Sequence, residues 1–170
     1  MQKFTPPKGL HIRPSTPNDK IFLEKLHREM REELQFIEGD QDFIDEIVAM
    51  QFRAQHQGYG AQFPNAMYFI IEKHQEKIGR ASIDFGCNEV HLIDIGFLKV
   101  ARGHGFGKAI IHSLQTCAAQ AAVPLSLVVA TDNFIAKKFY LSLGFMVKEH
   151  TEMHELMCWY PPTMKAIVGA

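Results

Sequence analysis

A short glycine-rich stretch carries the residues best suited to chemistry. It reads Arg102-Gly103-His104-Gly105-Phe106-Gly107-Lys108, directly after the apolar run 90–98 and at the start of a long amphipathic segment. Alternate glycines let the backbone bend sharply and direct several N–H groups to one side, and the helix that follows contributes the positive end of its dipole. Arg102 and Lys108 add fixed positive charge at the two edges. We therefore predict a strand, a phosphate-binding turn and a helix, suited to a polyanion such as a pyrophosphate.

Two other glycine motifs are excluded, each by a specific residue. A P-loop needs Gly-Lys followed by Ser or Thr, whereas Ala109 follows Lys108 here. A Rossmann turn needs the spacing G-x-G-x-x-G and an acidic residue about 20 positions later, whereas these glycines alternate and Val123 stands at that place. The alternative that stays open is a glycine-rich turn with no ligand.

The elements that must position this turn form an alternating α/β pattern. Strands are predicted over 10–13, 67–72, 78–85, 89–98, 125–129, 145–148 and 153–159. Helices are predicted over 43–51, over 105–122, and between the cap 131–133 and Gly144. A further helix is predicted to begin at 16–19, with Ile21, Phe22, Leu26 and Met30 on its apolar face. The short links between 67 and 98 predict an antiparallel meander. The crossover from 89–98 through a helix to 125–129 predicts one parallel pair.

Size and charge are those of an ordinary globular protein. The chain has 170 residues, of which 46% are hydrophobic and 22% are charged, and its net charge is −1. We expect one domain over 1–170, with a loose arm at 1–9 and a tail at 161–170. The charge balance gives no reason to expect nucleic acid as a partner, and no apolar run is long enough to cross a membrane.

Cysteine and histidine usage points away from disulfides and metals. Cys87, Cys117 and Cys158 are odd in number and lack C-x-x-C spacing, and the nine histidines show no metal-ligand spacing. The first residues also lack the apolar core of a signal peptide. We expect reduced, mostly buried thiols, no metal site and a cytoplasmic protein.

Two motifs in this order carry a family resemblance. Arg102-x-x-Gly105-x-Gly107 follows a strand, and Asn133-x-x-Ala136-x-x-Phe139-Tyr140-x-x-Leu143-Gly144-Phe145 follows some 26 residues later. This pattern resembles the GNAT superfamily of acyl-CoA N-acyltransferases, and the order of elements agrees over nearly the whole chain. The resemblance implies a mixed, mostly antiparallel central sheet of about seven strands with helices on both faces.

The resemblance also implies how acetyl-CoA, as co-substrate, would be held. The turn Arg102 through Lys108 corresponds to the family's pyrophosphate turn, and Asn133 corresponds to the asparagine that hydrogen-bonds the pantetheine side. The strand segment that pairs with pantetheine corresponds to Ile95, Gly96 and Phe97, in a strand that splays from its parallel neighbour 125–129 in the family. Gly96 would leave room for the close approach. Lys99 stands where many members have proline.

Two proton transfers accompany acyl transfer from a thioester to an amine. Tyr140 matches the tyrosine commonly assigned as general acid to the departing thiolate; the alternative is a helix tyrosine packed beside Phe139. The segment 127–129, where some members carry a glutamate base, has no ionisable group here. A carboxylate among apolar strand residues is either paired or available for proton transfer, so we take Asp94 as the candidate base. Three alternatives remain open, namely a structural hydrogen bond at Asp94, a base at Glu89 or His91, and ordered water.

The leading hypothesis is an N-acetyltransferase. It would move an acetyl group from acetyl-CoA to a primary amine of a small molecule or peptide by direct attack in a ternary complex. A non-catalytic acyl-CoA sensor or scaffold of the same fold is the alternative, and a longer acyl donor is also allowed. Acidic residues in 38–46 suggest a cationic acceptor. The resemblance allows a homodimer through the C-terminal strands.

Overall fold

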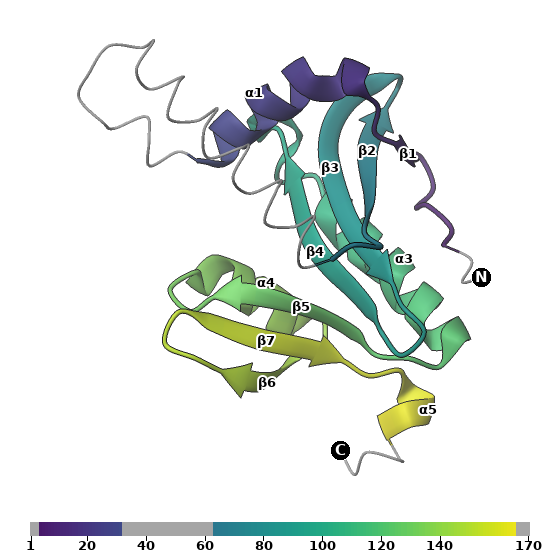
Figure 1. Cartoon of the computed structure of the whole chain (residues 1–170), viewed down its shortest axis with the longest axis vertical. Helices are drawn as coiled ribbons and strands as arrows, with labels where there is room; N and C mark the ends of the chain where they lie inside the picture. The colour runs from purple at the N-terminus through teal and green to yellow at the C-terminus, as the bar shows by residue number, and fades with distance from the viewer. Residues whose placement is uncertain (1–3, 32–62, 166–170) are drawn as a thin grey trace. The chain divides into compact units, whose positions relative to one another are not determined.

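The structure, a computed structural model, describes residues 4–31 and 63–165 (Figure 1). Its helices and strands follow the predicted order within those ranges. In chain order they are β1 (His11–Pro14), the 3₁₀ turn η1 (Pro17–Asp19), α1 (Lys20–Met30), β2 (Met67–Lys73), β3 (Glu76–Phe85), β4 (Val90–Phe97), η3 (Lys99–Ala101), α3 (Phe106–Ala121), β5 (Leu125–Ala130), α4 (Phe134–Ser142), β6 (Met146–His150), β7 (His154–Trp159) and α5 (Pro162–Lys165). The helix predicted over 43–51 lies outside the described residues, as do the acidic residues of 38–46.

The strands form one seven-stranded sheet in the order β1-β2-β3-β4-β5-β7-β6. The pairs β1–β2, β5–β7 and β6–β7 are antiparallel, and the pair β4–β5 is parallel, as the crossover predicts. The parallel ladder is short. It joins Val90 to Leu125, His91 to Ser126 and Leu92 to Leu127, although β4 continues to Phe97 and β5 to Ala130.

The chain divides into two compact units. Unit 1 consists of Met1–Pro7, Ile83–Ile93 and Lys108–Ala170, and unit 2 consists of Lys8–Ser82 and Asp94–Gly107. Strands β3 and β4 each contribute residues to both units. The single domain expected over 1–170 stays a prediction.

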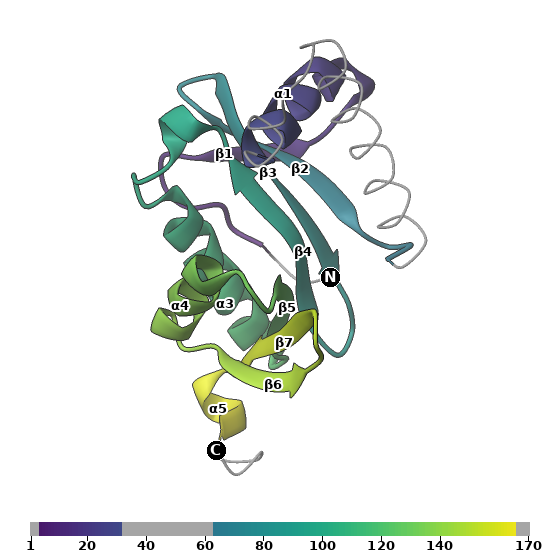
Figure 2. The same ribbon diagram turned by 90° about the vertical axis from the view of Figure 1, so that its left-hand side faces the viewer.

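Unit 1 is built around the predicted amphipathic helix. In α3, Ile110, Leu114 and Cys117 are buried, and their spacing of three or four residues places them on one face of the helix. Figure 2 shows α4 next to α3, and Gln115 Nε2 donates to the carbonyl of Leu143 at 2.9 Å. In Figure 1, β5, β7 and β6 run side by side. Gly144 ends the α4 region with φ of +93°, the left-handed cap that its sequence position predicts.

The three cysteines are free thiols in unit 1. Cys117 and Cys158 are buried, and Cys87 is exposed. Burial raises the pKa of both buried thiols, because the thiolate loses its hydration there. The expectation of reduced, mostly buried cysteines agrees with this arrangement.

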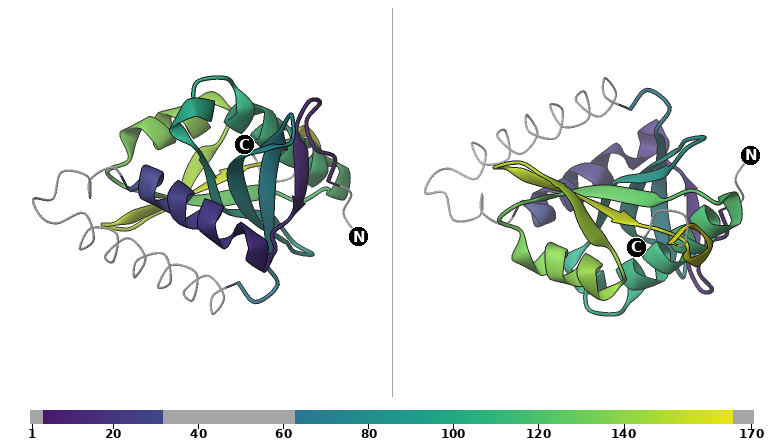
Figure 3. Two further views of the ribbon diagram at one scale, coloured as in Figure 1. Left: turned by 90° about the horizontal axis from the view of Figure 1, so that it is seen from above. Right: turned by 90° about the horizontal axis from the view of Figure 1, so that it is seen from below.

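In unit 2, α1 lies along the sheet (Figure 3). The predicted face is correct at Leu26, which is fully buried, and at Met30, whose side chain lies against Gly96 of β4. It is wrong at Ile21, which is 83% exposed. Phe22, Leu26 and Met30 follow one another at i, i+4 spacing, whereas Ile21 is turned about 100° away from Phe22.

The described parts of the arm and of the tail each make specific contacts. Phe4 packs its ring against Phe85 at 5.9 Å between centroids, so the described part of the arm is anchored within unit 1. Beyond Pro161, α5 forms one helical turn, in which the Met164 N–H donates to the Pro161 carbonyl at 2.8 Å. Pro162 suits the first helical position because its missing N–H would have no helical partner there.

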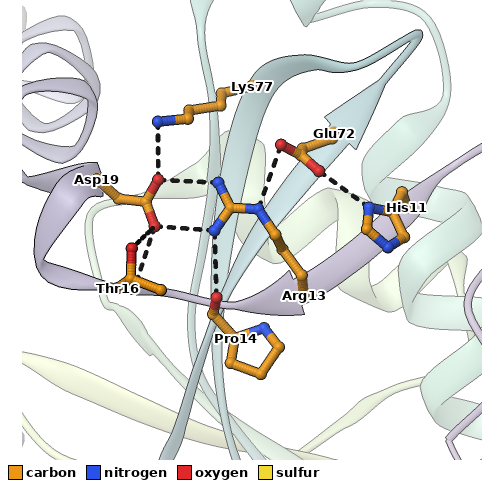
Figure 4. A network of polar contacts seen from close by, with 7 residues as sticks. All are labelled: His11, Arg13, Pro14, Thr16, Asp19, Glu72 and Lys77. Carbon is orange, nitrogen blue, oxygen red and sulfur yellow. Dashed lines mark hydrogen bonds and ion pairs between the residues drawn. The ribbon is translucent and has the colours of Figure 1, made fainter.

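A buried carboxylate joins β1, η1 and β3 in unit 2 (Figure 4). Asp19 is 1% exposed and accepts both ends of the Arg13 guanidinium, each at 2.9 Å. Lys77 Nζ lies 2.8 Å from the same carboxylate, and the Thr16 N–H donates to it at 2.8 Å in a capping box. Hydrogen bonds from Arg13, Lys77 and Thr16 hold the pKa of Asp19 well below its usual range.

The same guanidinium also reaches β2. Arg13 Nε lies 3.3 Å from Glu72, whose other oxygen is 2.9 Å from His11 Nδ1. Hydrogen bonds to Glu72, chiefly from His11 and also from Arg13, lower the pKa of this carboxyl group. Arg13 therefore links the antiparallel pair β1–β2 to the start of α1 through two carboxylates.

We expect Asp19→Asn to lower the free energy of unfolding by about 3 kcal/mol, because it leaves Arg13 and Lys77 without their shared anion. The folded pKa of Asp19 lies below its unfolded value of about 3.9, so its contribution is present above that pH and is lost as the pH falls. Urea unfolding from pH 7 to pH 3 should therefore show the two proteins converging in acid. Glu76→Gln, at an exposed position of β3, is the control. A constant difference at all pH values would contradict this account.

Candidate active site

The glycine turn has the backbone that the motif predicts. Gly103 and Gly105 have φ of +80° and +82°, in the left-handed region that favours glycine. A Cβ built on either residue would meet nothing within 4 Å. These glycines are therefore needed for the backbone conformation and not for packing, and the space beside them is open. Phe106 and Gly107 then begin α3, where the first four N–H groups have no helical partner.

Arg102 braces the turn from within. Its Nε donates to the carbonyl of Phe97 at 3.0 Å, and an Nη lies 3.5 Å from the carbonyl of Glu29. Glu29 also accepts the Lys99 N–H at 2.8 Å, a hydrogen bond that a proline at this position could not donate. Arg102 was predicted to add positive charge at one edge of the turn; its guanidinium keeps that charge and donates to two backbone carbonyls, and its role toward a ligand stays a prediction. Lys108, at the other edge, is exposed in the first turn of α3.

The predicted pantetheine segment lies at the end of β4. Ile95 and Phe97 are half-buried and Gly96 is buried. A Cβ at Gly96 would clash with the side chain of Met30, so the space that glycine leaves on this side is taken by α1. The ladder between β4 and β5 has already ended at Leu92, before this segment begins.

Asn133 is the N-cap of α4. Its side-chain oxygen accepts the Ala136 N–H at 3.2 Å, which satisfies one of the unpaired donors of the first turn. Asn133 is exposed, and its amide also carries two N–H donors. The cap and a hydrogen bond from this amide to a ligand are thus chemically compatible.

Tyr140 lies in an aromatic cluster on the inner side of α4. It is 8% exposed and packs edge-to-face against Phe139 at 5.2 Å and against Phe145 at 5.5 Å. Its carbonyl accepts the N–H groups of Leu143 and Phe145 where the helix ends. The packing alternative raised for this residue is therefore present, and it fixes the ring in place.

Asp94 is paired with an arginine. Its carboxylate lies 2.5 Å from Arg80 Nε on β3, and the two side chains are only 12% and 10% exposed. The alternative of a structural hydrogen bond was expected to involve a loop, and the partner is instead a guanidinium in a strand.

The other two candidate bases form a hydrogen-bonded chain at the start of β4. Ser126 Oγ donates to Glu89 at 2.8 Å and lies 2.7 Å from His91 Nδ1. His91 and Ser126 are buried register partners in the short parallel ladder. Burial lowers the pKa of His91, and the nearby Glu89 and Asp84 only partly offset this. The side-chain hydrogen bonds between Glu89, Ser126 and His91 therefore reinforce the parallel ladder between β4 and β5.

The candidate residues fall into both units. Unit 2 brings together Asp94, the segment Ile95–Phe97 and the turn up to Gly107, whereas Lys108, Asn133 and Tyr140 belong to unit 1. Within residues 4–31 and 63–165, no group of three or more His, Cys, Asp or Glu side chains is placed to hold a metal ion. In the same residues, no helix is long and apolar enough to cross a membrane.

Sequence reasoning missed the residues that support the predicted ones. No role was predicted for Arg80 or Glu29, and Met30 was predicted only to lie on the apolar face of a helix. One signal was available for Arg80, because it is the only cation in the alternating strand 78–85 and precedes a strand that carries the anions Glu89 and Asp94. Nothing local marks Glu29, whose partners Lys99 and Arg102 are about 70 residues away in the chain.

The Arg80–Asp94 pair yields a test by double-mutant cycle. Asp94→Asn should lower the free energy of unfolding by about 3 kcal/mol, because it leaves a nearly buried guanidinium unpaired. Arg80→Met with Asp94→Leu should lose less than the sum of the two single variants, since it removes both charges. Urea unfolding of the four proteins measures the coupling, and strict additivity would contradict a direct pair.

Comparisons with known proteins identify the family. A model of the acetyltransferase (GNAT) family matches residues 23–145, which is more than half of the chain. No curated protein matches the chain in sequence.

Solved structures share the fold at low sequence identity. The PaiA N-acetyltransferase of Thermoplasma acidophilum in complex with coenzyme A is 14% identical, with a TM-score of 0.66 over 89% of this chain and 98% of its own. An acetyltransferase of Thermus thermophilus is 19% identical, with a TM-score of 0.64 over 92% and 99%. A chimera of the spermidine N-acetyltransferase SpeG from Vibrio cholerae and hSSAT is 18% identical, with a TM-score of 0.61 over 90% and 96%. These neighbours confirm the predicted fold class. The match of the family model over residues 23–145 shows that the chain belongs to the acetyltransferase (GNAT) family.

Proposed function

We propose that the protein is an acetyl-CoA-dependent N-acetyltransferase that acts on a primary amine of a small molecule or peptide. The glycine turn carries the proposal, because its two left-handed glycines lie directly before α3, whose first N–H groups have no helical partner. Such a turn is suited to the pyrophosphate of coenzyme A. Family membership supports the acetyl transfer, and the PaiA structure of the same fold contains coenzyme A.

The acceptor is proposed to be cationic in its resting form. One structure of the same fold is a spermidine N-acetyltransferase chimera, which illustrates a small-molecule amine acceptor. The acidic residues of 38–46 are compatible with such an acceptor but lie outside the described residues. A cytoplasmic location and a homodimer stay predictions.

The chemistry asked of the side chains is small, because a thioester is already activated toward amines. Holding the amine nitrogen near the thioester carbonyl supplies most of the acceleration. The ammonium must first lose one proton to the base, and its nitrogen then bonds to the acetyl carbon. As the carbon–sulfur bond breaks, the nitrogen gives up a second proton, which restores the phenol that protonates the sulfur. Tyr140 would donate its phenolic proton to the departing sulfur. Burial between Phe139 and Phe145 supports this role, because a fixed ring holds its hydroxyl in one direction.

Asp94 is the proposed base, with Arg80 as its positioning partner. The ion pair fixes the direction of the carboxylate and occupies one of its oxygens. A carboxylate in this state can orient a water molecule that takes the proton from the amine. Direct proton removal and removal through water therefore both involve Asp94.

One observation favours the second candidate function, a non-catalytic acyl-CoA-binding module. The only carboxylate predicted as a base within β4 is already paired with Arg80. A binding module would keep the glycine turn and would need no base. Activity with an amine, and not binding alone, separates the two functions.

Binding of acetyl-CoA should raise the melting temperature of the protein. At about 100 times its Kd the ligand adds about 2.7 kcal/mol of stability, or about 5–10 °C for a chain of this size. Gly107→Glu should abolish most of this rise, because its carboxylate would repel the phosphates. The same carboxylate favours the helix N-terminus, so the variant should fold. Differential scanning fluorimetry makes the measurement.

Gly107→Gln is the matched control, since it adds the same bulk without the charge, and it should retain more of the rise. No rise in the wild-type protein would overturn the proposed acetyl-CoA site. An equal loss in both variants would show that bulk alone is responsible.

Tyr140→Phe should reduce kcat for amine acetylation about 100-fold and leave the Kd for acetyl-CoA unchanged. The substitution keeps the ring that packs against Phe139 and Phe145, so stability should change little. Steady-state kinetics against pH should also lose the alkaline limb assigned to the phenol. An unchanged kcat would leave Tyr140 a packing residue only.

A further inference from the structure

Lys73 lies beside Phe106, at the end of the glycine turn, although the two residues are far apart in the sequence of unit 2. It is the last residue of β2, and the next two residues turn the chain with positive φ at His74 and Gln75. Its Nζ lies 5.2 Å from the centroid of the Phe106 ring, over its face. Phe106 is the first residue of α3, so this contact places an ammonium group beside the helix N-terminus.

The Phe106 ring is itself held on other sides. The His104 ring stacks on it at 5.7 Å with an angle of 28° between the planes, and Phe97 lies 6.3 Å away. An aromatic face attracts an ammonium group through its quadrupole. It leaves the positive charge unneutralised. Lys73 is therefore held in place and still able to bind an anion.

Arg102 cannot fill this role in the same way. Its guanidinium donates to the carbonyls of Phe97 and Glu29, and so it braces the turn from within. The backbone N–H groups of an open glycine turn carry only partial charges, whereas a pyrophosphate carries full ones. A cation beside Phe106 adds a further full charge at the start of α3, besides that of Lys108 in the first helical turn.

We propose that Lys73 binds the pyrophosphate of coenzyme A from above Phe106, together with the N–H groups of the turn 103–107. This inference rests on the proposed acetyl-CoA site and adds to it a residue from the β2–β3 turn. Phe106 acts as a positioning residue, because its ring directs the ammonium group. The 3′-phosphate is not the proposed partner, since the contact lies at the start of α3.

Isothermal titration calorimetry with coenzyme A and with 3′-dephospho-coenzyme A tests the assignment. Lys73→Met keeps roughly the length of the side chain and should raise the Kd of both ligands about tenfold, which corresponds to the loss of one charge-assisted hydrogen bond. Lys73→Arg should keep most of the affinity for both ligands. Phe106→Leu should lower this affinity several-fold, because no aromatic ring then directs the ammonium group of Lys73. Lys20→Met, at an exposed position of the same unit, is the control for loss of one charge and should bind as the wild type does.

The outcomes separate this inference from the function on which it rests. If the wild type binds neither ligand, the proposed acetyl-CoA site fails. If the wild type binds and folded Lys73→Met binds equally well, only the role of Lys73 is overturned. A loss confined to coenzyme A would assign Lys73 to the 3′-phosphate, and an equal loss in Lys20→Met would reduce the effect to net charge; either result overturns the proposal. Melting temperatures of the free proteins verify that each variant is folded.

Discussion

The left-handed backbone at Gly103 and Gly105 is the constraint on which the candidate site depends. An L-residue with a side chain costs about 1–2 kcal/mol in this conformation, and here two such positions are separated by one residue. Nothing packs against either glycine, so the surrounding fold gives no reason for their small size. The turn is held by contacts around it, from Arg102 to Phe97 and from Lys99 to Glu29. Its outer side is left open, which is what a phosphate group requires.

The short parallel ladder is the second feature that shapes unit 1. Three residue pairs join β4 to β5, whereas six pairs join β5 to β7. Buried backbone groups need partners, so each pair in such a short ladder matters. The chain from His91 through Ser126 to Glu89 adds side-chain hydrogen bonds to its middle pair. This gives a structural role to two residues that looked like candidate bases in the sequence.

The sequence predicted what depends on local spacing and failed where distant strands and helices meet. The turn, the apolar face of α3 and the caps at Asn133 and Gly144 all follow from neighbours within a few residues, and the structure has each of them. The partner of Asp94 and the direction of Arg102 could not be predicted, because they depend on which strand and which helix end lie beside them. Ile21 was assigned to the buried face because helical spacing alone cannot separate a face from its margin.

The two units differ in their cysteine content and therefore in their reactivity toward thiol reagents. All three thiols belong to unit 1, and unit 2 has none in its sequence. Cys87 is exposed and open to alkylating reagents, whereas Cys117 and Cys158 are buried with raised pKa and react slowly until they are uncovered. Slow alkylation of these two thiols therefore reports the opening of unit 1 alone. Compared with the loss of circular dichroism from the whole chain, its rate distinguishes one cooperative unfolding event from two separate ones.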